Sequence, residues 1–167
     1  VQGFDDDAVR HLIFVGLGKK NKQYPVELFR RSVAHAYRAA EREKIKTYAL
    51  TLPSKSLFGI GAQELGRYAA TISLMAQYQF DDYLSEDAKV FKPKEFVLIA
   101  PTKEHKALKE GLKIGQTIGV AVNRSRHWID LPANEITPVS LAKRAKELGK
   151  KCGLEVSVFD EKKVEKL

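Results

Sequence analysis

Residues 126–138, "RHWIDLPANEITP", place two prolines and a Pro-Ala-Asn triplet between two helical patterns. An apolar-periodic segment precedes this stretch, and a lysine-rich segment follows it. Because proline fixes its own φ and has no amide hydrogen, a helix is not expected to run unbroken through the stretch. Thr137 is expected to cap the next helix, with Pro138 at its first position. The stretch therefore predicts a rigid turn between two parts of the chain. Asn134 is the side chain expected to bond nearby backbone and hold this turn.

On the carboxyl side of this turn, the sequence predicts a helix, a strand and the start of another helix. The apolar face of the first helix and the glycines that can end it are Leu141, Ala145, Leu148, Gly149 and Gly153. Residues 154–159, "LEVSVF", alternate like a strand, and Asp160 then resembles a helix cap. Since this tail is too short to bury its own apolar faces, we expect it to be the first β-α part of a second domain.

On the amino side, short apolar runs alternate with longer segments of helical periodicity. The expected strands and helices occupy, in chain order, residues 11–18, 26–40, 45–53, 62–76, 95–101 and 108–122. This alternation predicts an α/β layer fold with a mainly parallel sheet. Three strands are few for such a sheet, and the sequence opens almost directly on the first of them. We therefore expect further strands to precede the given sequence.

Length and composition are those of an ordinary globular protein. The chain has 167 residues, 44% of them hydrophobic and 30% charged, which suits one domain or one domain and the start of a second. Cys152 is the only cysteine, so no intrachain disulfide can form. The sequence has no apolar run of transmembrane length and no signal peptide at its start. A cytoplasmic location, without a membrane partner, is the expectation.

The net charge of +8 has two interpretations. Lysines and arginines alternate with glutamates in residues 41–46, 89–95 and 143–151, which favours a solvated surface. The alternative is an acidic partner, DNA included, because a basic excess attracts phosphates. No helix-turn-helix signature accompanies the charge, so DNA binding is the less favoured interpretation.

Two glycine-containing stretches are the first candidates for a binding site. Residues 16–20, "GLGKK", and residues 58–63, "FGIGAQ", match neither a Walker A loop nor a full dinucleotide fingerprint. We interpret them as turns at strand ends. The alternative is a contact to phosphate or ribose near a helix amino terminus.

The side chains that commonly perform chemistry form no pattern in the sequence. Four histidines show no zinc-ligand spacing: His11, His35, His105 and His127. The acidic pairs, which we interpret as solvated turns, are at residues 81–82, 86–87 and 160–161. Cys152 has no apparent histidine partner and is interpreted as an unreactive thiol.

Three glycines recur every four residues in one expected helix, at Gly111, Gly115 and Gly119. Glycine lowers helix stability by about 1 kcal/mol relative to alanine, so its repetition needs a reason. We expect close backbone packing against a neighbouring element. Packing within the domain is favoured, and packing in an assembly is the alternative.

The opening stretch, together with residues 139–167, resembles the domain junction of the leucyl (cytosol) aminopeptidase family. Members typically show Arg-Asp-Leu-Val-Asn-x-Pro-Ala-Asn-x-x-Thr-Pro at that place. The matching residues are Arg126, Pro132, Ala133, Asn134, Thr137 and Pro138. The departures are His127, Trp128 and Asp130.

The resemblance extends upstream over nearly the whole chain. Residues 14–19, "FVGLGK", are similar to the family's strand and glycine turn, and residues 74–83, "LMAQYQFDDY", to one of its helix ends. The Glu-Gly pair usual before that segment is Thr71-Ile72 here. The junction carries the most specific part of the resemblance.

The resemblance implies a three-layer, macro-domain-like amino-terminal domain with a mainly parallel sheet. It divides the chain into an amino-terminal α/β domain at 1–111, a connecting helix at 112–131 and the truncated start of a catalytic domain at 132–167. Family members are usually homo-hexamers. The partners it implies are the chain's own carboxyl-terminal catalytic domain, further copies of the chain and a peptide substrate.

The whole enzyme, by the same resemblance, releases amino-terminal amino acids from peptides with two divalent metals, zinc or manganese. The family's ligand motifs, Asn-Thr-Asp-Ala-Glu-Gly-Arg and a Gly-Lys-Gly segment, are absent from this sequence. No catalytic, cofactor-binding or metal-binding residue is therefore assigned, and residues 1–167 alone are expected to be inactive. Their role would be folding, assembly or regulation. The alternatives are a macro-like module that binds a nucleotide or ADP-ribose, and a DNA-binding accessory domain.

Overall fold

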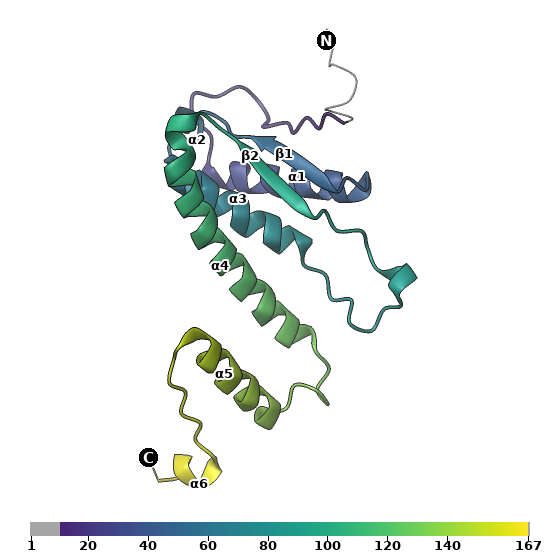
Figure 1. Ribbon diagram of the computed structural model, residues 1–167, viewed down its shortest axis with the longest axis vertical. Helices are drawn as coiled ribbons and strands as arrows, with labels where there is room; N and C mark the ends of the chain where they lie inside the picture. The colour runs from purple at the N-terminus through teal and green to yellow at the C-terminus, as the bar shows by residue number, and fades with distance from the viewer. Residues whose placement is uncertain (1–10, 167) are drawn as a thin grey trace. The chain divides into compact units, whose positions relative to one another are not determined.

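The computed structural model describes residues 11–166, except for the side chains of residues 55 and 56 (Figure 1). The chain divides into two compact units, Val1–Arg124 and Ser125–Leu167. The longer elements of the first unit are α1 (Val26–Arg42), β1 (Thr47–Thr51), α3 (Ala62–Gln77), β2 (Glu95–Ile99) and α4 (His105–Asp130), whose last turns belong to the second unit. The short ones are α2 (Lys55–Phe58), η1 (Glu86–Ala88) and η2 (Thr102–Glu104).

The two strands are parallel neighbours, with Thr47 opposite Glu95 and Thr51 opposite Ile99. Their side chains alternate between the two faces of the sheet, as the strand geometry requires. One face packs on α1 and α3, which lie behind the strands in Figure 1. The other face stays open, and Val97 and Ile99 on it are 41% and 52% exposed. The mixed α/β class and the parallel pairing expected from the alternation are confirmed.

The core lies between α1, α3 and the covered face of the sheet. Phe29 and Val33 of α1 meet Leu65 and Ala69 of α3, and all four are buried. Phe29 also packs against Phe58 of α2, with ring centroids 5.4 Å apart. Each fully buried large apolar side chain contributes about 1.5–3 kcal/mol, so this cluster holds the two helices and the sheet together.

The strand expected at residues 11–18 is not formed in the part of the chain that the structure describes. Burial does alternate there: Ile13 and Leu17 are half-buried against the core, while Leu12 and Phe14 are exposed. The prediction was wrong because a strand needs hydrogen bonds to a partner as well as an alternating sequence. Within residues 11–166 this segment has no paired strand beside it.

The second unit contains α5 (Pro138–Cys152) and α6 (Glu161–Val164). Asp160 caps α6 by accepting a hydrogen bond from the amide of Lys163 at 2.9 Å, as expected. The strand expected at residues 154–159 is not formed, because no other strand lies within residues 125–166 to pair with it.

Within the described residues, no helix is both long and apolar enough to cross a membrane.

Candidate functional site

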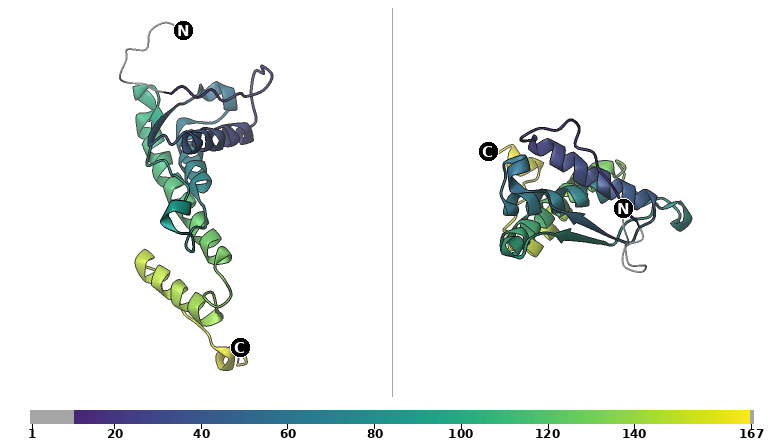
Figure 2. Two further views of the ribbon diagram at one scale, coloured as in Figure 1. Left: turned by 90° about the vertical axis from the view of Figure 1, so that its right-hand side faces the viewer. Right: turned by 90° about the horizontal axis from the view of Figure 1, so that it is seen from above.

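In the first unit, α3 and α4 run along each other (Figure 2), and their backbones come into close contact at several glycines. A Cβ built at Gly111 would lie 1.9 Å from the carbonyl oxygen of Gln63. A Cβ at Gly115 would lie 2.2 Å from the carbonyl oxygen of Arg67. These oxygens belong to the α3 backbone and cannot swing away as a side chain can. The repeated glycines of α4 therefore let two helix backbones touch, which confirms the expectation of packing within the domain.

The contact is matched from the α3 side. Gly66 faces α4, and a Cβ there would lie 2.7 Å from the carbonyl oxygen of Leu108. The hydroxyl of Thr71 donates to the carbonyl oxygen of Gly115 at 3.1 Å, in a buried position. Further along, the side-chain amide nitrogen Nδ2 of Asn123 donates to the carbonyl oxygen of Leu74 at 2.7 Å. Shape and hydrogen bonds together fix both the rotation of α4 about its axis and its position along α3.

The turn after α4 is held by its own backbone. Leu131 is 6% exposed, and its amide donates to the carbonyl oxygen of His127 at 3.2 Å. The carbonyl oxygen of Pro132 accepts hydrogen bonds from the amides of Glu135 at 2.9 Å and Ile136 at 3.1 Å. Residues 131–137 thus form an ordered turn, as the prolines predict.

The start of α5 is a reciprocal cap. Thr137 Oγ1 accepts from the amide of Ser140 at 3.2 Å, and Ser140 Oγ accepts from the amide of Thr137 at 2.8 Å. Pro138 occupies the first turn. At the other end, Gly153 adopts a left-handed conformation with φ of 69°. The predicted cap and the predicted helix stop are both confirmed.

Sequence reasoning misassigned the side chain that braces this turn. Asn134 is the obvious candidate from its type, since asparagine readily bonds nearby backbone. In the described residues Asn134 is exposed and its side chain makes no hydrogen bond. Ser140 does the bracing instead, because its hydroxyl lies 2.6 Å from the carbonyl oxygen of Glu135. The signal was present as a Thr-x-x-Ser spacing, a variant of the capping box.

Residues 23 and 24, which follow the first glycine-containing stretch, contact the second stretch and its preceding residue. Gly18 and Gly59 have positive φ values of 81° and 66°. A Cβ at Gly59 would lie 2.0 Å from Nε2 of Gln23, and the amide of Tyr24 donates to the carbonyl oxygen of Leu57 at 2.8 Å. Backbone conformation and this loop-to-loop contact account for glycine at these positions without any bound phosphate or ribose.

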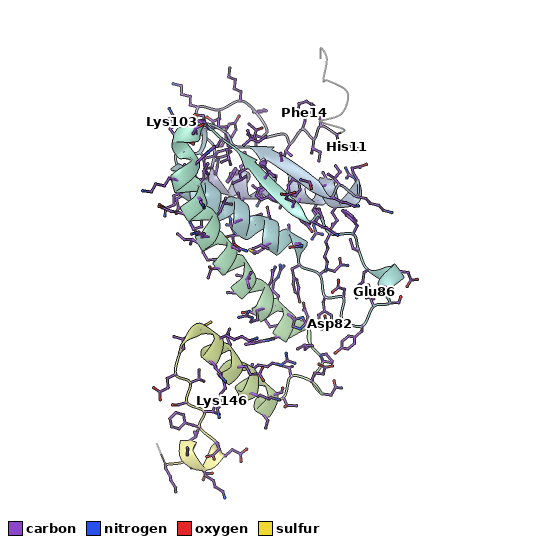
Figure 3. All side chains as sticks on the ribbon, in the orientation of Figure 1. His11, Phe14, Asp82, Glu86, Lys103 and Lys146 are labelled. Atoms are coloured by element: carbon purple, nitrogen blue, oxygen red, sulfur yellow. The ribbon has the colours of Figure 1, made fainter. Side chains whose placement is uncertain are left out.

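The histidines and acidic residues are dispersed over the described surface. Asp82 and Glu86 lie on the loop between α3 and β2, away from the sheet (Figure 3), and Glu86 pairs with Lys89. Asp81 accepts from Lys92 at 2.6 Å, and this hydrogen bond lowers the pKa of its carboxyl group. His105 contacts the carbonyl oxygen of Ala100 at 3.0 Å. Across residues 11–166, no group of three or more His, Cys, Asp or Glu side chains is arranged to hold a metal ion.

Three arginines of α1 are paired with glutamates of the same helix. On α1, Glu27 pairs with Arg30 at 2.9 Å and with Arg31 at 3.2 Å, and Arg38 pairs with Glu41 at 2.8 Å. This helix therefore presents alternating charges to solvent, which does not favour a phosphate-binding stripe.

A cavity of about 340 Å³ lies on the core side of the sheet, lined by Tyr37, Tyr48, Ser73, Gln77, Phe96 and Gln116 among others. The hydroxyl of Tyr48 donates to Ser73 Oγ at 3.4 Å. Tyr37 is 3% exposed, and its hydroxyl has no hydrogen-bond partner among the described residues. Burial, with a contribution from the nearby Glu41 carboxylate, raises the pKa of Tyr37 to about 12. Tyr37 therefore stays a neutral donor at physiological pH.

Comparison with known proteins assigns these features to a family. Residues 1–87 match the family model described as "Cytosol aminopeptidase family, N-terminal domain". Similar curated proteins are the probable cytosol aminopeptidases of Aquifex aeolicus (strain VF5), 30% identical over 162 residues, and of Geobacter sp. (strain M21), 31% identical over 157 residues. These matches cover 96% and 93% of this chain.

A solved structure with the same fold is "Bottromycin maturation enzyme BotP in complex with Mn", with a TM-score of 0.65 and 26% identity. The match covers 83% of this chain and 28% of that one. The chain spans about 31% of the length of the two curated relatives. The family model covers more than half of the residues and names the amino-terminal domain. The chain therefore belongs to the cytosol aminopeptidase family.

Proposed function

We propose that residues 1–167 are the amino-terminal part of an aminopeptidase that releases amino-terminal amino acids from peptides. The observation that carries this proposal is the match of residues 1–87 to the family's amino-terminal domain, combined with relatives about three times as long. Under this proposal, residues 1–111 form the amino-terminal domain, 112–131 the connecting helix and 132–167 the start of the catalytic domain. The names of the relatives, which are cytosol aminopeptidases, support a cytoplasmic location.

In this proposal, the chain's own contribution is to fix the connecting helix. The glycine contacts with α3 and the Asn123 hydrogen bond fix one position and one rotation of α4 on the amino-terminal domain. The reciprocal cap of Thr137 and Ser140 then sets where α5 begins. A helix held this firmly suits folding, assembly or regulation of a larger enzyme.

Two divalent metals, zinc or manganese, are proposed for the parent enzyme. The manganese named with the solved bottromycin maturation enzyme supports this choice of ion. The described residues of this chain do not fit a metal centre, so the ligands are assigned to the rest of the polypeptide. The hexamer is proposed on the family resemblance.

The test compares two proteins in one assay, the full-length gene product and residues 1–167. Hydrolysis of leucine p-nitroanilide is followed with added manganese or zinc. We expect metal-dependent turnover from the full-length protein and none from residues 1–167. Turnover by the pure shorter chain would place the active site within it. A full-length protein that is folded, loaded with either metal and inactive on leucine and other amino-acyl substrates would contradict the proposed reaction.

A further inference from the structure

The cavity of about 340 Å³ beside Tyr37 has a buried inner end and an open mouth. All of its lining residues belong to the first unit. The buried ones mark the inner end, and the exposed ones, Lys94, Glu95 and Gln116, mark the mouth. The mouth therefore lies between the start of β2 (Figure 1) and the middle of α4.

The inner end is mainly apolar. Tyr48 packs against both Tyr37 and Phe96, with ring centroids 6.3 Å and 5.1 Å away. Leu74 of α3 and Leu112 of α4 line the cavity as well. None of the buried residues that line it carries a charged side chain, and an unpaired charge is costly to bury. This end therefore suits the apolar part of a ligand, which gains free energy by leaving water.

The mouth offers two opposite charges side by side. Lys94 and Glu95 are consecutive residues, and both line the cavity. Glu95 Oε2 accepts from Thr47 Oγ1 at 3.2 Å, which holds its carboxylate beside the sheet. Within residues 11–166, neither Lys94 nor Glu95 has an ion-pair partner. The mouth can therefore pair with one negative and one positive group of a single ligand.

The size of the cavity limits the ligand to a small molecule. One water takes up about 30 Å³ in the liquid, so a space of about 340 Å³ has room for about eleven non-hydrogen atoms. Free leucine, isoleucine and phenylalanine have this size. A nucleotide is larger, and its phosphates would meet a single cation with a carboxylate beside it.

We propose that this cavity binds a free α-amino acid with a large apolar side chain. The side chain lies at the inner end, against Tyr48, Phe96 and Leu112. The carboxylate lies at Lys94 and the ammonium group at Glu95, so that both charges of the ligand are paired at the mouth. An amino acid is the ligand that combines an apolar body with one charge of each sign at the same end.

The proposed function supplies a source for this ligand, because an aminopeptidase releases free amino acids, and the proposal rests on it for this point alone. Since α4 contributes Leu112 and Gln116 to the cavity, a ligand bound here stabilises the packing of this helix on the domain. A released amino acid would thereby act on the helix whose last turns belong to the second unit.

Photo-crosslinking locates the ligand in the full-length protein. The probe is a leucine analogue whose side chain carries a diazirine, which inserts into neighbouring bonds on illumination. We expect label on peptides that contain residues 70–77, 93–96 or 112–116, three segments that line the cavity, and loss of this label with excess leucine. Absence of label from all three segments would overturn the proposal.

Gln116 provides a matched pair of variants, because its side chain is exposed and its replacement leaves the core intact. Gln116→Trp fills the mouth, whereas Gln116→Ala leaves it open. We expect the label on the three segments to persist in Gln116→Ala and to fall at least about 10-fold in Gln116→Trp. Equal labelling of the two folded variants would contradict the site. If circular dichroism showed that Gln116→Trp does not fold, the labelling of the unaltered protein and the ligand series below would decide.

The paired charges are tested with two analogues of leucine as competitors of the diazirine label. Leucinol lacks the carboxylate, and 4-methylpentanoate lacks the ammonium group. Each should compete at least about 10-fold more weakly than leucine, because each loses one charge-assisted hydrogen bond. Equal competition by all three ligands would make the cavity a site for apolar molecules in general, and the proposal would be wrong.

Two variants assign each charge of the ligand to its partner. Lys94→Met should remove the difference between leucine and leucinol. Glu95→Gln keeps the shape of the side chain and should remove the difference between leucine and 4-methylpentanoate. Both differences persisting in both variants would show that other groups bind the charges, against the proposed orientation.

The labelling experiment also separates this proposal from the proposed function. Label in the cavity of a full-length protein without peptidase activity would refute the proposed function and retain the site. Peptidase activity without label on the three segments would retain the proposed function and refute the site.

Discussion

The carbonyl oxygen of Arg67 lies 2.2 Å from the position that a Cβ at Gly115 would occupy. This distance is shorter than any real contact of a Cβ atom with a backbone oxygen. It means that α3 and α4 approach each other too closely for any side chain at this position, and that α4 has glycine there.

Gly115→Ala is therefore expected to destabilise the protein. Alanine in a helix gains about 1 kcal/mol over glycine, but overpacking against a fixed neighbour costs about 1–3 kcal/mol. We expect the clash to prevail and the free energy of unfolding to fall, measured by urea denaturation. Gly16→Ala is the control, because a Cβ at Gly16 would have no atom within 4 Å. Equal effects of the two substitutions would contradict the close approach.

Ser140 and Asn134 are expected to differ sharply in their contributions to the turn. Ser140→Ala removes the bond from the Thr137 amide to the Ser140 hydroxyl and the bond from that hydroxyl to Glu135, and should lower the free energy of unfolding by about 1 kcal/mol. Asn134→Ala removes no hydrogen bond and should change it by less than about 0.5 kcal/mol. Thermal unfolding of both variants decides the matter. If Asn134→Ala lowered the free energy of unfolding more than Ser140→Ala, Asn134 would be the side chain that holds the turn.

Tyr37 makes stability depend on alkaline pH. Its pKa is raised from 10.0 to about 12, so above pH 10 the unfolded chain loses the phenolic proton while the folded chain retains it. The titration of Tyr37 therefore leaves the free energy of unfolding unchanged below pH 10 and lowers it as the pH rises from 10 toward 12. Tyr37→Phe should reduce this loss, which pairs of urea titrations at pH 8 and pH 10.5 can measure.

At neutral pH the same substitution should be neutral or stabilising, by up to about 1 kcal/mol, because the buried hydroxyl it removes has no partner in residues 11–166. Tyr48→Phe is the comparison, since the Tyr48 hydroxyl donates to Ser73. A clear loss of stability in Tyr37→Phe at pH 7 would mean that something satisfies this hydroxyl within the cavity.

DNA binding by residues 1–167 is expected to be weak. Arg30, Arg31 and Arg38 of α1 pair with glutamates on the same helix, so this helix offers few free cations to phosphates. An electrophoretic shift assay with duplex DNA should show faint binding at low salt and none at about 150 mM salt. A shift that survives that salt at micromolar protein would make DNA binding the leading accessory role.

Features that depend on local sequence could be predicted. The Thr137 cap, the Gly153 stop and the buried face of α1 each follow from residues within one or two turns of each other. The glycines of α4 predicted a close contact, although not which helix would make it. No side chain of the described part was expected to be catalytic, and that expectation still awaits the activity assay.

Features that depend on distant partners could not be predicted. Residues 11–17 have the alternation of a strand, but whether they form one is decided by a neighbour that their own sequence does not specify. The cavity at Tyr37 brings α1, α3, α4 and both strands together, so no single segment carries a signal for it. The role of Ser140 follows from its spacing three residues after Thr137, whereas the type of Asn134 alone does not determine which side chain holds the turn.

The glycine spacing of α4 also determines how this protein can change in length. One residue inserted between Gly115 and Gly119 would turn the rest of the helix by about 100°, since a helix has 3.6 residues per turn. Gly119 would leave the α3 surface, where its Cβ position lies 2.8 Å from the Leu74 side chain. The loop at residues 78–94 is not a helix that must keep one face turned toward another helix. Insertions and deletions among homologues should therefore accumulate in that loop and be purged from residues 111–119.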